Sequence, residues 1–210
     1  MVYEIENELG DIRAVESRTY LRTNTVKPLV TGDLAPYFGL SQAPNHWIAQ
    51  ARPHTTPAID LSIFDLLNER PLVVSFYCPC WGAYARPFLN GLIRLYPAIQ
   101  QAGAELVVFS NESPRSVDPK KKIEFLLTHD VDFQVAKTFG LYSEEDPIWD
   151  RISGISADVY TPGLYVVDTN RRIKYHFVDE NFDQRPDEAA LIHTIHSLQK
   201  KKTANPVGAL

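Results

Sequence analysis

Two short hydrophobic runs separated by a helical pattern dominate the middle of the chain. Leu72 to Phe76 and residues 105–110 are apolar and rich in β-branched residues, which predicts two buried strands. Between them, apolar residues recur at helical spacing on one side of a helix that should end near Gly103: Phe88, Leu89, Leu92, Ile93 and Leu95. The pattern therefore predicts a strand–helix–strand unit with two parallel strands.

The remaining periodicities predict the elements around this unit. Residues 59–71 predict a short helix capped by Asp60 or Ser62, residues 122–130 the start of an amphipathic helix, and residues 131–146 a short helix that stops at Gly140. Alternating positions in residues 163–180, with Thr169 and Asn170 at the turn, predict a hairpin, and residues 185–202 predict a last helix.

Parallel βαβ followed by antiparallel ββα is the order of a thioredoxin-like α/β fold, with a central mixed sheet flanked by helices. This fold usually carries a cis proline before the first strand of the hairpin. We therefore predict a cis bond between Thr161 and Pro162.

The 210 residues predict one main domain with two appendages. We expect a helix or an arm at residues 1–25, a single domain at residues 26–200 and a flexible tail at residues 201–210. Within the domain, the proline-rich residues 41–57 predict a loop insertion.

Composition limits the partners and the cellular location that we expect, but it does not identify a function. The net charge of −5 argues against nucleic acid or an anionic membrane as a partner, and no apolar run is long enough to span a membrane. The acidic start of the chain lacks the basic and apolar regions of a signal peptide. We expect a cytoplasmic protein whose thiols are reduced at rest.

Both cysteines of the chain, Cys78 and Cys80, lie in a Cys-Pro-Cys-Trp-Gly turn between the first buried strand and its helix. The positive end of a helix favours a thiolate there. One interpretation is a catalytic redox pair whose disulfide closes a small, strained and easily reduced ring. The alternatives are a packing role, or a metal site for which His193 and His196 lie on a distant helix. We expect no cofactor.

Four stretches in order resemble the peroxiredoxin-like branch of the thioredoxin superfamily, the alkyl hydroperoxide reductase and thiol-specific antioxidant group. They are GDLAPYFGL (32–40), LVVSFYCPCWGAY (72–84), AKTFGLY (136–142) and TPGLYVVDTNRRIKYHFVDENFDQRP (161–186). The resemblance covers residues 28 to 197 and implies the fold of that group.

The residues that catalyse the usual peroxiredoxin reaction are missing from the resembling stretches. It implies that the threonine, cysteine and arginine of a typical peroxiredoxin site fall near Gly82, Ala85 and Pro162, so the standard active site is degenerate. Alanine has no lone pair to attack a peroxide, so the standard mechanism at residue 85 is excluded.

The vacated position still defines a candidate substrate-binding pocket. Trp81 and Tyr84 are either core aromatics or the wall of a ligand pocket, and Arg86 is either solvated or holds an anion at the helix start. With these we group Gly82, Ala85, Thr161 and Pro162 as substrate-binding candidates.

Three functions stay open. The leading hypothesis is an antioxidant thiol oxidoreductase that performs disulfide exchange or peroxide reduction through the displaced Cys78 and Cys80. The others are a non-redox pseudo-enzyme that binds proteins, and an enzyme that uses the vacated pocket for other small-molecule chemistry. The corresponding partners are a thiol reductant or a small-molecule substrate. A homodimer through sheet edges or loops would fit the resembled family.

Overall fold

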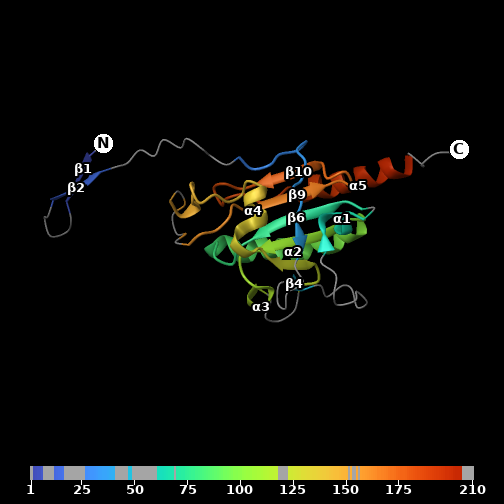
Figure 1. Cartoon of the computed structure of the whole chain (residues 1–210), viewed down its shortest axis with the longest axis horizontal. Helices are drawn as coiled ribbons and strands as arrows, with labels where there is room; N and C mark the ends of the chain where they lie inside the picture. The colour runs from blue at the N-terminus through green and yellow to red at the C-terminus, as the bar shows by residue number, and fades with distance from the viewer. Residues whose placement is uncertain are drawn as a thin grey trace.

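The computed structural model describes residues 2–6, 12–16, 27–40, 47–48, 61–68, 70–117, 123–150, 152, 155 and 157–204. Its centre is a mixed sheet with the strand order β10-β9-β6-β7-β8-β4. The strands are β4 (Trp47–Ile48), β6 (Leu72–Tyr77), β7 (Glu105–Ser110), β8 (Leu126–His129), β9 (Gly163–Val167) and β10 (Ile173–Val178). Figure 1 shows this sheet at the centre of the molecule with helices around it. The predicted fold class, a thioredoxin-like α/β fold with a mixed sheet, is confirmed.

Helices and short turns connect the strands. The helices are α1 (Ile63–Leu66), α2 (Ala85–Gln101), α3 (Pro114–Val117), α4 (Gln134–Thr138) and α5 (Glu188–Ala204). Three 3₁₀ turns cover Gly82–Tyr84, Val131–Phe133 and Ile148–Asp150. Small two-stranded sheets join β1 (Val2–Glu6) to β2 (Ile12–Glu16) and β3 (Gly39–Leu40) to β5 (Leu61–Ser62).

The pairing of the central strands follows from their composition. β6 and β7 are buried along their whole length and pair in parallel, with α2 as the connection between them. β9 pairs antiparallel with β6, and β10 returns antiparallel to β9. The predicted βαβ unit and hairpin are therefore confirmed.

The two faces of the sheet carry different layers. Because side chains alternate along a strand, Phe76 and Tyr77 of β6 point to opposite faces. Phe76 packs against Phe109 and Phe139, so the C-terminal end of α4 covers that face, whereas Tyr77 packs against Trp81 in the turn before α2. α5 contacts α2, β9 and β10, which places the two long helices side by side.

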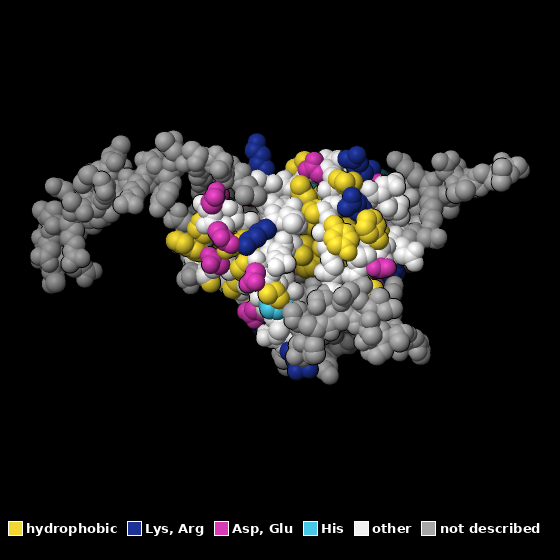
Figure 2. Space-filling model, viewed as in Figure 1, with side chains coloured by type: hydrophobic (Ala, Val, Ile, Leu, Met, Phe, Trp, Pro, Cys, Tyr) yellow, Lys and Arg dark blue, Asp and Glu magenta, His cyan; other side chains and the backbone are white. Residues whose placement is uncertain are grey.

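The lead-in at residues 27–40 is fixed by backbone hydrogen bonds to distant parts of the chain. Gly32 N donates to Ile173 O at 2.9 Å, and Ala35 N donates to Arg171 O at 2.7 Å. Nearby, Tyr37 and Phe64 are exposed and their ring centres are 6.0 Å apart, with the Arg171 guanidinium 5.4 Å from the Phe64 ring. Figure 2 shows hydrophobic side chains and Lys or Arg side chains gathered on the face in view.

The prediction of a helix at residues 122–130 is wrong. Residues 126–129 form β8, which pairs in parallel with β7. Ile123, Phe125 and Leu127 are all buried while Glu124 between them is exposed, and this is the two-residue alternation of a strand.

The prediction of a cis bond before Pro162 is also wrong, because the described residues contain no cis peptide bond. Trans is the lower-energy isomer of an X–Pro bond, and here it is compatible with the backbone pairing on both sides. Thr161 N donates to Leu141 O at 2.9 Å, and Asp179 N donates to Pro162 O at 3.0 Å.

The two ends of the chain differ in part from the expectations. Where a helix or an arm is predicted, β1 and β2 form an antiparallel pair, so the helical alternative is wrong. α5 continues to Ala204, past the predicted boundary at residue 200. The remainder of the predicted tail and most of the insertion at residues 41–57 lie outside the described residues, although β4 of that insertion pairs with β8.

Candidate functional site

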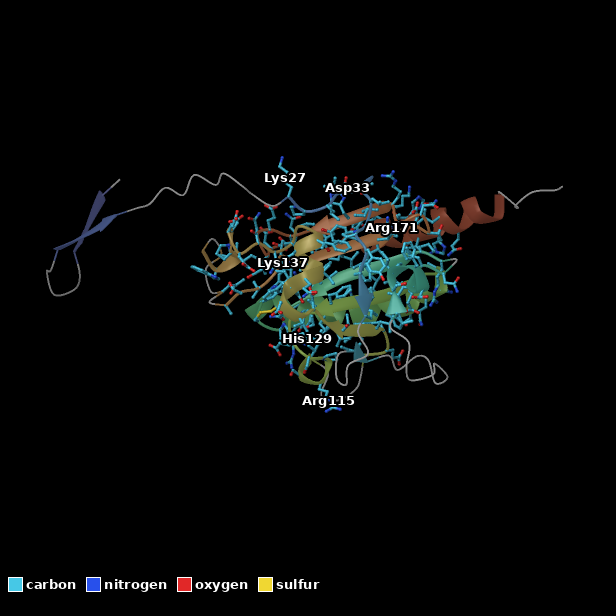
Figure 3. The ribbon with its side chains drawn as sticks, viewed as in Figure 1. Lys27, Asp33, Arg115, His129, Lys137 and Arg171 are labelled. Carbon is cyan, nitrogen blue, oxygen red and sulfur yellow. A yellow bond between two sulfur atoms is a disulfide. The ribbon has the colours of Figure 1, made fainter. Side chains whose placement is uncertain are left out.

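The candidate site lies where β6 and β7 end. The register pairs Tyr77 with Ser110, so the residues that follow them, Cys78 and Asn111, come out of the sheet next to each other. Cys78 and Cys80 form a disulfide, which Figure 3 shows as the yellow bond at one end of the sheet. The carboxyl ends of parallel strands are where α/β proteins commonly bind ligands.

The two sulfur atoms have different surroundings. Cys78 is fully buried at the end of β6, whereas Cys80 is half-buried in the turn. Cys80 N donates to Cys78 Sγ at 3.1 Å, and Asn111 Nδ2 donates to Cys80 Sγ at 3.5 Å. Each sulfur therefore has one N–H donor, and Cys80 is the sulfur that a reagent can approach.

A buried tyrosine fixes the two strand ends that carry this disulfide. The Tyr160 hydroxyl lies 2.7 Å from Tyr77 O and 3.0 Å from Phe109 O, and its side chain is completely buried. Burial raises the pKa of the Tyr160 hydroxyl well above its usual value, so it stays protonated and able to donate. The positions of Cys78 and Asn111 therefore depend on a rigid support.

Trp81 and Tyr84, which we predicted to be either core or pocket wall, are both buried. Trp81 is 3% exposed and donates from Nε1 to Tyr160 O at 2.9 Å. Tyr84 is 6% exposed, and its hydroxyl donates to Gln184 O at 3.0 Å. The Arg185 guanidinium lies 4.0 Å from the centre of the Tyr84 ring, a cation–π contact. These contacts place both rings in a packed aromatic cluster that holds the start of α2.

The other predicted binding residues divide into exposed and buried groups. Gly82 is exposed with φ +57°, a left-handed conformation that suits glycine, and Arg86 is exposed on α2. Ala85 is 4% exposed and is the first residue of α2, so its methyl group is buried. Thr161 and Pro162 are buried just before β9.

Charge around the site is sparse and mixed. Burial, followed by the carboxylate of Glu112, raises the pKa of Tyr77, and Arg86 acts in the opposite direction.

Among the described residues, no group of three or more His, Cys, Asp or Glu side chains could hold a metal ion. No described helix is long and apolar enough to cross a membrane.

The site also contains residues that our reading of the sequence did not include. Asn111 follows β7, and its carbonyl oxygen lies 3.2 Å from Nε2 of His129 at the end of β8. Asp130 accepts from Val135 N and Ala136 N, both at 2.9 Å, and burial raises the pKa of its carboxyl group. The sequence could have indicated Asn111, because the residues that follow two parallel strands lie at the same edge of the sheet.

Solved structures of peroxiredoxins share the architecture around this site. The chain matches the reduced 2-Cys peroxiredoxin of Plasmodium vivax with a TM-score of 0.61 at 14% identity, covering 83% of this chain and 99% of that one. Enterococcus faecalis AhpC gives 0.60 at 13% identity, covering 86% and 99%. Peroxidoxin BcpB of Mycobacterium tuberculosis gives 0.58 at 18% identity, covering 81% and 98%. At these identities the likeness establishes the thioredoxin-like fold of peroxiredoxins.

A family model then defines the relationship. Residues 32–176 match the AhpC/TSA family, which is more than half of the chain, and the protein belongs to that family. The expected resemblance is confirmed. A search of curated protein sequences finds no match.

Proposed function

We propose that the protein is a thiol–disulfide oxidoreductase that works through Cys78 and Cys80. The observation that carries the proposal is the disulfide at the end of β6, with one buried sulfur and one half-buried sulfur. Membership of the AhpC/TSA family supports a thiol-dependent role. Residue 85, where the resemblance places the family's cysteine, is alanine and cannot supply a thiolate.

Reduction would begin at the accessible sulfur. A reductant thiolate attacks Cys80 Sγ, a mixed disulfide forms, and Cys78 Sγ leaves with the electron pair as a thiolate. The Cys80 N–H, which already donates to this sulfur at 3.1 Å, stabilises that leaving group. A second thiol of the reductant then attacks the mixed disulfide. Its sulfur bonds to the reductant sulfur, and both cysteines are released in reduced form.

Oxidation would return the pair to the disulfide. The Cys80 thiolate attacks one oxygen of a peroxide, and the O–O bond breaks to give a sulfenic acid and an alkoxide, which is protonated to an alcohol. Cys78 then attacks the sulfenic sulfur and water leaves. A disulfide of another protein could replace the peroxide as the oxidant by the same exchange chemistry. We propose peroxide as the first oxidant to test because of the family.

The partner implied by this cycle is a dithiol reductant in the cytoplasm, where thiols are kept reduced. We also propose a homodimer, in keeping with the resembled family, and light scattering in solution would measure its mass. The alternative function is a non-redox protein that uses the fold for binding or for other small-molecule chemistry. The burial of Ala85 and the packing of Trp81 and Tyr84 are the observations that favour this alternative.

The test compares the wild type with Cys78→Ser and Cys80→Ser. The folded wild type should consume hydrogen peroxide in the presence of dithiothreitol, and Cys80→Ser should lose that turnover. Cys78→Ser should turn over only as fast as dithiothreitol reduces its Cys80 sulfenic acid directly. The variants also test which sulfur is attacked. Cys80 in Cys78→Ser should react with an aromatic disulfide reagent about tenfold faster than the buried Cys78 in Cys80→Ser.

Two results would contradict the proposal. One is a wild-type disulfide that dithiothreitol cannot reduce while the protein stays folded, as followed by alkylation and mass spectrometry. The other is equal turnover in the wild type and both serine variants, which would place any activity elsewhere in the molecule.

A further inference from the structure

Asn111 is held in a fixed position beside the disulfide. It follows β7 directly, and Tyr77 and Ser110 are register partners, so its backbone is set by the same parallel pairing that sets Cys78. On its other side, the Asn111 carbonyl oxygen lies 3.2 Å from Nε2 of His129. The amide side chain therefore extends toward the disulfide from a backbone anchored on two neighbouring strands.

Only one end of this amide has a hydrogen-bond partner. Nδ2 donates to Cys80 Sγ at 3.5 Å, whereas Oδ1 is buried and, within the described part of the chain, has no donor. A buried acceptor without a donor is unfavourable. The disulfide form therefore leaves the hydrogen-bonding capacity of Asn111 partly unused.

We propose that Asn111 is a positioning residue that stabilises the reduced form of Cys80. This inference rests on the proposed disulfide exchange. When the disulfide opens, the Cys80 thiol gains a hydrogen that Oδ1 can accept after a small rotation of the amide. When the thiol ionises, Nδ2 donates to a full negative charge, which is a stronger interaction than its contact with a disulfide sulfur.

Two consequences follow for the chemistry of the pair. Asn111 shifts the redox equilibrium toward the dithiol, because it interacts more strongly with the thiol or thiolate than with the disulfide. It also supports the thiolate on which oxidation begins, because its amide donor already lies at Cys80, the less buried of the two cysteines. Asn111 takes no part in bond making, so it acts through Cys80.

Other ionisable groups near this end of the sheet also act on the pKa of Cys80, so the test must leave them in place. They come from each neighbouring element: Tyr77 from β6, Arg86 from α2, Glu112 after β7, His129 and Asp130 at and after β8, and Tyr160 before β9. None of these is changed by a substitution at residue 111. A shift in Asn111→Leu therefore reports the loss of the amide, whereas a shift in Asn111→Asp also includes the effect of the added charge.

The experiment measures how alkylation of Cys80 by iodoacetamide depends on pH. The full chain with Cys78→Ser contains a single thiol, so the rate reports Cys80 alone. Asn111→Leu keeps the size of the side chain and removes both polar atoms, and Asn111→Asp keeps the shape while replacing the donor with a negative charge. We expect the midpoint of the profile to rise by about one pH unit in Asn111→Leu and by more in Asn111→Asp.

A second measurement uses the natural cysteine pair. In glutathione buffers, Asn111→Leu should shift the equilibrium about fivefold toward the Cys78–Cys80 disulfide. Asn90→Asp is the matched control, since it adds the same charge at an exposed position of α2 and should leave both measurements unchanged. Near-ultraviolet circular dichroism checks that each variant is folded, and the isosteric Asn111→Asp keeps the test available if Asn111→Leu does not fold.

An unchanged midpoint in folded Asn111→Leu would overturn the inference, and so would an unchanged midpoint in folded Asn111→Asp if the leucine variant does not fold. The proposed function fails separately, when dithiothreitol cannot open the wild-type disulfide in the folded protein. The alkylation series does not depend on that step, because it uses a chain in which the Cys78–Cys80 disulfide cannot form.

Discussion

Tyr160 joins two strands at the point where both of them leave the sheet. Its hydroxyl lies within hydrogen-bonding distance of Tyr77 O and Phe109 O, and its backbone carbonyl accepts from Trp81 Nε1. One residue thus contacts the strand before the disulfide, the strand before Asn111 and the turn after Cys80. At the residue scale, this residue therefore supports both strand ends that carry the candidate site.

Tyr160→Phe should destabilise the fold by about 1–3 kcal/mol, because it removes from a buried site the single hydroxyl hydrogen that Tyr77 O and Phe109 O share. The free energy of unfolding in urea measures this cost. Tyr37→Phe is the matched control, because Tyr37 is 62% exposed, and we expect a change of less than about 0.5 kcal/mol there. Equal effects at the two positions would show that the Tyr160 hydroxyl is not a structural link.

At the scale of elements, the tight fit of the lead-in against the end of α4 constrains the backbone most. Gly140 has φ +70°, and a Cβ atom there would lie within 3.0 Å of the backbone of residues 27–28. Gly91 within α2 is the opposite case, with open space where a Cβ atom would be. The same chemical change therefore has opposite consequences in two helical regions.

Gly140→Ala should cost more than about 2 kcal/mol, from the left-handed conformation and from overlap with the lead-in backbone. Gly91→Ala should stabilise the protein by about 0.5–1 kcal/mol, because alanine loses less entropy than glycine in a helix. Thermal and urea unfolding of the pair would decide. A stabilised Gly140→Ala would mean that the lead-in does not pack as described.

Elements with a clear period could be predicted from sequence, and those fixed by distant pairing could not. β6, α2, β7 and the β9–β10 hairpin carry their own patterns. Of the two caps predicted for α1, Asp60 and Ser62, the structure shows Ser62, which forms a capping box with Asp65. In the segment before Asp130, buried residues alternate with others, but Leu126 and Leu127 are adjacent apolar residues. The pattern therefore fits a helix as well as a strand. Its strand state depends on pairing with β7, in which Val107 is the register partner of Leu126.

The candidate site was predictable to a similar extent. The position of Cys78 and Cys80 after a strand and before a helix could be inferred from the local pattern. The choice for Trp81 between core and pocket wall depended on Tyr160, which lies about eighty residues further on. Asn111 carries no local signal, since only the β6–β7 register places it beside the sulfur atoms.

At the scale of the whole molecule, the disulfide closes a very short loop and so contributes little to holding the fold together. Its cysteines are separated by 2 positions, and the stabilisation from a cross-link grows with the length of the closed loop. The sheet and its aromatic layers bury the core without it. The disulfide is therefore free to open without loss of the domain.

Reduction with dithiothreitol should lower the free energy of unfolding by less than about 2 kcal/mol. Urea unfolding of the oxidised and reduced forms measures the difference, and the double variant Cys78→Ser, Cys80→Ser should resemble the reduced form. Unfolding on reduction at neutral pH would instead make the disulfide a structural link, and that result would count against its proposed use in exchange.

The burial of Trp81 directly after Cys80 gives the protein an optical reporter of its own redox state. Disulfides quench the fluorescence of neighbouring indoles, so emission from Trp81 should increase when the bond opens. Trp47 and Trp149 are the other tryptophans of the chain, and replacing both by phenylalanine would leave a single emitter beside the sulfur atoms. The opening and closing of the pair could then be followed in real time without a label.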